Sequence, residues 1–220
     1  RFRRALSVAI DRSELNETVY LGLAKPSNNT VMEGSKLFKP EYAKKWAQYD
    51  PKLANKLLDE VGLKKKDSQG FRLLPDGRPA TIVVEHQSEE TEDADALQLI
   101  AEMWKKVGIK MLTKPQTREN FRLRAFSGEA IMTAFAGVVT AMPTPNTSPK
   151  EFAPTMQGGL QWSRWGMFIE SKERMGEKCD VEAACKLLDY VKEWEHGTSE
   201  AERRAAWEKI LTSTADEVFT

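Results

Sequence analysis

The chain has 220 residues, a length that suits one large domain or two small ones and that can bury a sizeable core. Thirty-three Lys and Arg residues balance thirty-three Asp and Glu residues, so no net charge attracts nucleic acid or an anionic membrane surface, and nucleic-acid binding is not expected. The sequence has no apolar run of the roughly 20 residues that span a bilayer, and its first residues lack the apolar core of a secretory signal.

The first 60 residues predict a series of short helices. Apolar residues recur at helical spacing over residues 2–10, and Asp11 then marks the start of a second helix that Gly22 ends. An irregular stretch rich in Pro, Asn, Gly and Ser follows, and loops of that length tend to be functional or disordered. Asp50-Pro51 indicates an N-cap and the first position of a further helix, which ends at Gly62.

The middle of the chain predicts a sheet. Two apolar stretches joined by "PDGRP" indicate a β-hairpin with strands at about Phe71–Leu74 and Thr81–Glu85. A helical period over residues 91–108 and the strand "IKMLTKP" follow, which predicts a crossover onto a shared sheet. After a short helix capped by Thr117, the apolar run "AIMTAFAGVV" predicts a central strand buried on both faces. The expected fold class is α/β, with a mixed sheet of about four strands and packed helices.

The last 80 residues predict a long loop and two helices. Residues 140–176 contain four prolines, a Gly pair and two tryptophans without a clear period, which predicts an ordered or semi-ordered loop over the sheet edge. Residues 181–194 and 199–218 predict two amphipathic helices. Four other tryptophans on apolar helical faces are expected in the core: Trp46, Trp104, Trp194 and Trp207. No internal repeat occurs, and no boundary splits the chain into independent domains.

No motif for catalysis or metal binding stands out. His86 and His196 are the only histidines, and no nucleophile motif accompanies them. The carboxylates of "HQSEETEDAD" open a helix, where acidic side chains favour the macrodipole and are usually solvated. Cys179 and Cys185 fit no metal-ligand spacing, and a disulfide between them would require Cys179 to lie before the helix begins. We therefore expect no enzyme, no metal site and no cofactor, and we leave the disulfide open.

The order of these signals resembles one family. "RRALSVAIDRSELNETVYLGLAKP", "YDPKLANKLLDEVGL" with the following "DGRP", and "LIAEMWKKVGIKMLTK" are similar to successive blocks of the family 5 extracytoplasmic solute-binding proteins of bacterial ABC importers. This family includes oligopeptide-, dipeptide- and nickel-binding proteins. The resemblance covers essentially all 220 residues and one lobe of a periplasmic-binding-protein-like (type II) two-lobe receptor. It implies that residues 1–220 form a single C-terminal lobe, excised from a chain whose N-terminal lobe is missing here.

The resemblance also implies how such a receptor works. The solute would lie in a cleft between this lobe and the larger one, and hinge closure would trap it for an ABC permease in the membrane. A periplasmic or extracytoplasmic location is implied, with the signal peptide outside this fragment. A different class, a helix-rich interaction module that docks a partner through charged faces such as "AERRAAWEKI" and "LKKKD", stays open, although such faces are more often only solvated.

Two features bear on the solute. Peptide binders of the family place an acidic residue, which meets the peptide amino group, just after the strand that matches "IMTAFAGVV", whereas this chain has no Asp or Glu between Glu129 and Glu151. The segment "GLQWSRWGMFIESKERMGE" is similar to a Trp-rich branch, some members of which take oligosaccharides. A sugar has no charge to neutralise, and its C–H faces stack on Trp. An oligosaccharide is favoured, and a peptide or nickel-type solute remains the alternative.

The candidate ligand-binding residues fall into three groups: Phe135, Ala136, Gly137 and Val138, then Trp162 and Trp165, then Asn28 and Asn29. The first group lies near the expected carboxyl end of a strand, where ligands collect in α/β sheets, or else it is strand interior. The tryptophans either stack on ligand or hold the loop in place. The asparagines either bond solute hydroxyls or form a turn.

Overall fold

The structure, a computed structural model, describes residues 1–88, 91–135, 139–159 and 161–220, without the side chains of residues 91 and 92. Contacts divide the chain into two compact units. The first unit comprises Arg1–Ser27, Trp46–Phe121 and Ala130–Phe135, and the second comprises Asn28–Lys45, Arg122–Glu129 and Ala136–Thr220. The expectation of a single lobe over residues 1–220 stays a prediction.

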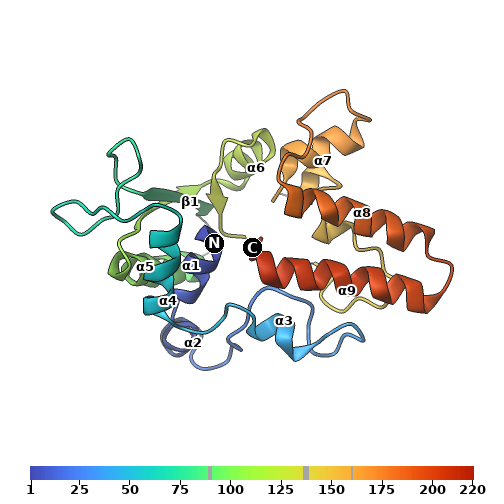
Figure 1. Cartoon of the computed structure of the whole chain (residues 1–220), viewed down its shortest axis with the longest axis horizontal. Helices are drawn as coiled ribbons and strands as arrows, with labels where there is room; N and C mark the ends of the chain where they lie inside the picture. The colour runs from blue at the N-terminus through green and yellow to red at the C-terminus, as the bar shows by residue number, and fades with distance from the viewer. Residues whose placement is uncertain (89–90, 136–138, 160) are drawn as a thin grey trace. The chain divides into compact units, whose positions relative to one another are not determined.

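The first unit contains a parallel sheet in the order β2-β1-β3, of which Figure 1 labels β1. Its strands are β1 (Thr81–Gln87), β2 (Lys110–Gln116) and β3 (Met132–Thr133). Thr81 of β1 lies opposite Lys110 of β2, and Val84 lies opposite Met132 of β3. The helix α5 (Thr91–Lys106) connects β1 to β2, because parallel neighbours need a long crossover. The predicted α/β class is confirmed.

The predicted mixed sheet of about four strands is wrong for the residues that the structure describes, which form three strands, all parallel. The segment Phe71–Leu74 does not join the sheet. It makes only isolated bridges, from Arg72 to Lys66 and from Leu73 to Pro79. The buried Arg72 side chain explains this, because it donates to the Val107 carbonyl at 2.8 Å and holds the segment against the end of α5.

The predicted central strand also differs. Among the described residues of "AIMTAFAGVV", only Met132 and Thr133 are strand, and they lie at the edge of the described sheet, with Ile131 88% exposed. β1 is the central strand instead, although its buried end is polar rather than apolar. Residues 136–138 of the predicted strand lie outside the described residues.

The helices of the first unit follow the predicted start signals. They are α1 (Phe2–Val8), α2 (Arg12–Val19), α4 (Pro51–Glu60) and α5. Asp11 accepts the N–H groups of Ser13 and Glu14 at 3.1 Å, and Asp50 accepts that of Leu53 at 2.9 Å, so both capping predictions are confirmed. The core between the sheet and these helices includes Ala5, Val8, Ala54, Leu58, Trp104 and Ile109.

The second unit is built on α8 (Glu182–His196) and α9 (Glu200–Glu217), which lie side by side (Figure 1). It also contains α3 (Pro40–Lys44), α7 (Ser163–Glu170) and the short 3-10 turns η1 (Lys150–Phe152) and η2 (Gln157–Gly159). The helix α6 (Arg118–Ser127) contains the boundary between the units. The prediction of a loop over all of residues 140–176 is wrong at α7, which is a helix. The sequence did not indicate this helix, because its mostly half-buried residues show no clean apolar period.

The predicted core tryptophans are only partly confirmed. Trp104 and Trp207 are buried, whereas Trp46 and Trp194 are half-buried. Trp46 lies beyond the end of α3 with a positive φ of 56°, so it is on no helix. Among the residues described, no helix combines the length and the apolar composition that crossing a bilayer requires.

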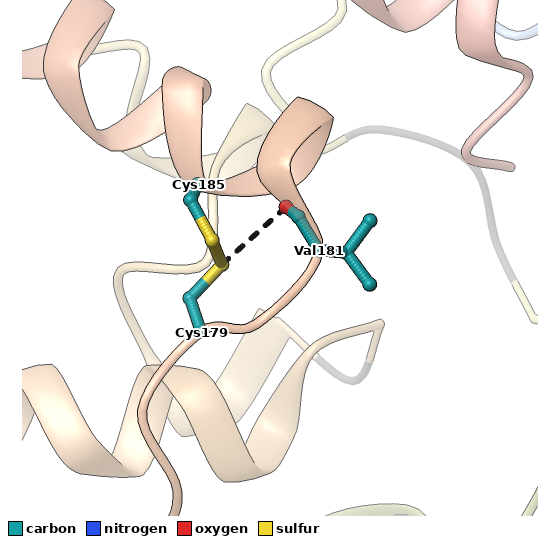
Figure 2. Close-up of a disulfide and its surroundings, with 3 residues drawn as sticks. All are labelled: Cys179, Val181 and Cys185. Atoms are coloured by element: carbon teal, nitrogen blue, oxygen red, sulfur yellow. Dashed lines mark hydrogen bonds between the residues drawn. A yellow bond between two sulfur atoms is a disulfide. The ribbon is translucent and has the colours of Figure 1, made fainter.

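A disulfide joins Cys179 to Cys185 in the second unit (Figure 2). Cys179 lies before α8 and Cys185 in its first turn, with their Cα atoms 5.7 Å apart, so the geometric condition for the bridge is met. The Cys179 Sγ lies 3.8 Å from the Val181 carbonyl oxygen. This is a van der Waals contact, since a bridged sulfur carries no hydrogen. The bridge ties the segment after α7 to the start of α8.

Candidate ligand-binding site

The carboxyl ends of β1 and β3 form the first candidate site. β2 and β3 lie on opposite sides of β1, so the connections diverge at this point, where open α/β sheets bind ligands. Phe135 follows β3, and its 42% exposed ring stacks on the buried ring of Phe121 with 5.7 Å between centroids. The Ala134 N–H donates to the Glu85 carbonyl at 2.9 Å, which fixes the chain just before Phe135. Ala136, Gly137 and Val138 lie outside the described residues, and their ligand role stays a prediction.

Three consecutive buried polar residues, Glu85, His86 and Gln87, end β1. The Glu85 carboxylate accepts from the Gln116 side-chain amide at 3.3 Å and lies 3.7 Å from the Lys114 ammonium. The His86 Nδ1 lies 3.1 Å from the Gln87 carbonyl, which can only accept, so this contact places a hydrogen on Nδ1. Sequence reasoning missed this group. The signal that marks it is a polar run at the carboxyl end of a parallel strand.

Trp162 and Trp165 lie together in the second unit. Their rings stack with 6.4 Å between centroids and 18° between planes, and Trp162 also meets Phe219 edge-on at 5.2 Å. Gly166 lets α7 approach the backbone of Met156 closely because glycine has no Cβ, and a Cβ added there would lie 2.1 Å from Met156. The rings of Trp165 and Phe219 therefore support the Trp162 ring on two sides. Trp165 has one ring contact among the described residues, which makes it the better platform for a solute.

Asn28 and Asn29 lie against the end of α9. The Asn28 amide donates to the Ala215 carbonyl at 3.3 Å, and the Asn29 amide donates to the Thr220 hydroxyl at 2.9 Å. The Asn29 N–H also donates to the Asn28 side-chain oxygen at 2.9 Å. These bonds favour a structural role, and the predicted ligand role of both residues stays a prediction. Because Phe219 contacts Trp162, the tryptophan pair and the asparagine pair meet at the same segment, residues 215–220.

The proline loop (residues 139–149) belongs to the second unit, and other residues of that unit hold it by hydrogen bonds. The Val139 N–H donates to Glu151 Oε1 at 2.5 Å, and the Thr140 N–H donates to Glu151 Oε2 at 2.9 Å. Trp194 and Trp207 each donate an indole N–H to a carbonyl of this loop, at 2.7 Å and 2.8 Å. Sequence reasoning missed Glu151, because it counted only carboxylates between Glu129 and Glu151.

A surface hollow of about 570 Å³ lies along α4. The residues that line it all have polar or charged side chains: Lys52, Asn55, Lys56, Asp59, Glu60 and Lys64. It contains neither a predicted site residue nor an aromatic side chain. We assign no ligand to it, because small-molecule sites are lined mainly by hydrophobic and aromatic side chains, and none lines this hollow.

Residues 1–158 match the family described as bacterial extracellular solute-binding proteins, family 5, middle region. The chain belongs to this family. The resemblance of the sequence blocks is thereby confirmed. Family 5 members are extracellular binding proteins by description, rather than enzymes.

Individual relatives agree with this assignment. The oligopeptide-binding protein OppA of Lactococcus lactis subsp. lactis is 30% identical over 109 residues, which cover 50% of this chain and 18% of that protein. The periplasmic alpha-galactoside-binding protein of Rhizobium meliloti (strain 1021) is 25% identical over 228 residues, which cover 99% and 31%. A solved oligopeptide-binding protein OppA superposes with a TM-score of 0.85 at 27% identity, covering 99% of this chain and 36% of that one. The chain thus spans less than a third of the length of these curated relatives.

Proposed function

We propose that the chain is the ligand-closing lobe of a solute receptor that serves an ABC importer. Family membership supports binding, and the observation that carries the site is the exposed ring of Phe135 at the carboxyl ends of β1 and β3. The missing N-terminal lobe of the same chain forms the other wall of the cleft. Contacts made only when the cleft closes favour the closed state, which the permease then recognises.

An oligosaccharide is the solute that we propose. Trp162 and Trp165 form a stacked, half-buried pair, and the C–H face of a sugar packs well on such a ring. Residues 130–150 supply no carboxylate of their own, as suits a neutral solute. The alpha-galactoside-binding relative, matched over nearly the whole chain, supports the same class.

An oligopeptide is the second candidate solute. The OppA relatives favour it. Glu151 favours it too, because its carboxylate reaches the backbone of Val139 and Thr140, close to where a peptide amino group would need a negative charge. The absence of Asp and Glu from residues 130–150 therefore does not mean that no carboxylate lies near this segment, because Glu151 reaches it.

A periplasmic or extracytoplasmic location completes the proposal. The disulfide between Cys179 and Cys185 supports it, since such bridges persist in oxidising compartments and are rare in the cytosol. The family description points the same way.

A thermal-shift and calorimetric screen of the intact protein tests this function. The panel contains cello- and other oligosaccharides beside di- to pentapeptides. A solute that binds the native state raises the melting temperature by mass action. A shift with a sugar supports the first candidate, and a shift with peptides alone supports the second. If neither sugars nor peptides bind, the proposed function is contradicted.

A further inference from the structure

We propose that Gly176 is a positioning residue for solute binding, because it lets the return segment (residues 171–179) hold the helix that carries Trp165. The return segment follows α7 and ends at the disulfide of Cys179. The return segment, α7 and α8 all belong to the second unit. The proposal rests on the proposed function, because it assumes that the Trp165 ring meets the solute.

The helix α7 needs support from outside itself. It has only eight residues, and its N-cap residue, Trp162, has no acceptor atom in its side chain to cap the first turn. Helices this short are marginal in water unless tertiary packing stabilises them. Among the described residues, the Trp165 ring makes its one ring contact with Trp162 of the same turn. The position of Trp165 in the unit therefore depends on what holds the α7 backbone.

The return segment packs directly on the α7 backbone. A Cβ added to Gly176 would overlap the Arg164 carbonyl oxygen and would lie 2.7 Å from the Phe168 nitrogen. Gly176 also has a φ of 84°, which strains residues other than glycine, so only glycine allows this approach. The next residue, Glu177, donates its N–H to the Arg164 carbonyl at 3.1 Å, and its carboxylate accepts from the Arg164 guanidinium at 3.1 Å.

The disulfide joins the return segment to the core of the second unit. Cys179 ends the segment, and its partner Cys185 lies in the first turn of α8 (Figure 2). Ala184 and Leu187, on either side of Cys185 in the sequence, are both buried, and Leu187 belongs to the apolar core of this unit. The first turn of α7 is thus held by a segment that is covalently linked to a packed helix.

Trp165 lies between two close backbone contacts of α7. Arg164, the residue before it, contacts the return segment, and Gly166, the residue after it, packs against Met156. These contacts hold the backbone of Trp165 from both directions before any solute arrives. A platform that is fixed in advance spares the solute the entropy of ordering it.

Gly176→Ala in the intact protein tests the proposal. The matched control is Gly158→Ala in the same unit, because a Cβ added to Gly158 meets no atom of the described residues within 4 Å. The solute is the oligosaccharide that gives the largest thermal shift with the wild type. We expect Gly176→Ala to weaken its binding about five-fold, and to speed hydrogen exchange of the Glu177 amide in the absence of solute. The control should change neither readout.

A double-mutant cycle with Trp165→Ala distinguishes positioning of the ring from a general loss of structure. If Gly176 acts through the ring, Gly176→Ala should cost little further affinity in a protein that already carries Trp165→Ala. Titrations are made below the melting transition of every variant, so that only folded protein is compared. A five-fold loss in both backgrounds would overturn the positioning role.

The readouts separate failure of this proposal from failure of the proposed function. Unchanged exchange of the Glu177 amide in Gly176→Ala overturns the contact between the return segment and α7. Faster exchange with unchanged affinity overturns the positioning role and leaves the proposed function intact. If the wild type binds no sugar, the proposed oligosaccharide solute and this proposal both fall. Should Gly176→Ala not fold, Cys179→Ser combined with Cys185→Ser, which removes the link to α8, carries the same cycle.

Discussion

The two units reach a fixed structure by different means. The first unit relies on regular elements, with a parallel sheet, capped helices and one apolar core. The second unit has the α8–α9 pair, and a long irregular stretch packs against it through indole N–H groups and a disulfide. Within that stretch, the Glu151 carboxylate accepts backbone N–H groups. Irregular backbone needs such partners because its N–H and C=O groups have no helix or ladder to satisfy them. The difference suggests where each unit is most sensitive to substitution.

The largest expected effect is in the core of the second unit. Trp207 is fully buried, packs on Phe152 and donates to Thr147, so Trp207→Ala should lower the free energy of unfolding by about 3–5 kcal/mol. Trp207→Phe keeps a six-membered ring but loses the indole N–H and the rest of the indole, and should cost less, about 2 kcal/mol. Urea denaturation measures both. Equal costs for the two variants would mean that the hydrogen bond to the loop, rather than the packed ring, dominates.

The first unit has its own sensitive point at Arg72. Its buried guanidinium donates to the Val107 carbonyl at 2.8 Å, to Asn55 at 2.7 Å and to Asp59 at 2.5 Å. Arg72→Met keeps most of the volume but leaves these acceptors without a donor, so we expect a loss of about 3 kcal/mol. Denaturant unfolding tests it against Arg78→Met, an exposed arginine that pairs with Asp76. Similar small losses for both variants would contradict the structural role of Arg72.

The disulfide should contribute less than either buried side chain. It closes a short loop, and the loop-closure entropy of a bridge of this span is worth about 2 kcal/mol. Cys179→Ser combined with Cys185→Ser should therefore lower the free energy of unfolding by that amount. Reduction of the wild type should give the same loss. A wild type whose stability is the same with and without reductant would show that the bridge is not formed.

The smallest expected effect is at the start of α9. Bonds from the Thr198 N–H and hydroxyl, and then from the Ser199 N–H, lower the pKa of Glu202 below its ordinary value of 4.5. A carboxyl whose pKa is lower in the folded state stabilises the fold above the unfolded pKa and loses this effect as pH falls through the folded pKa. Glu202→Gln should lower the melting temperature slightly at pH 7, and the difference from wild type should shrink below pH 4.5. A constant difference across this range would contradict the capping role.

The elements that sequence predicted well depend on local signals. Asp11 and Asp50 cap the helices that they were expected to cap, because an N-cap needs only its own first turn. Phe71–Leu74 could not be excluded as a strand, because what removes it from the sheet is the burial of Arg72 against residues far along the chain.

The candidate site was less predictable for the same reason. Phe135 and the two tryptophans were identified from residue type and position, but their ring partners Phe121 and Phe219 are set by tertiary packing. Glu151 was missed because its carboxylate acts on backbone more than ten residues away in sequence. No local pattern marks such a contact.

Calorimetric titration of the intact protein with an oligosaccharide, wild type against Trp165→Ala, tests the central claim most directly. The account predicts that the wild type binds the sugar and that Trp165→Ala weakens binding about ten-fold, because the stacking surface is lost. Equal affinity in the two proteins, or binding of peptides alone, would contradict it.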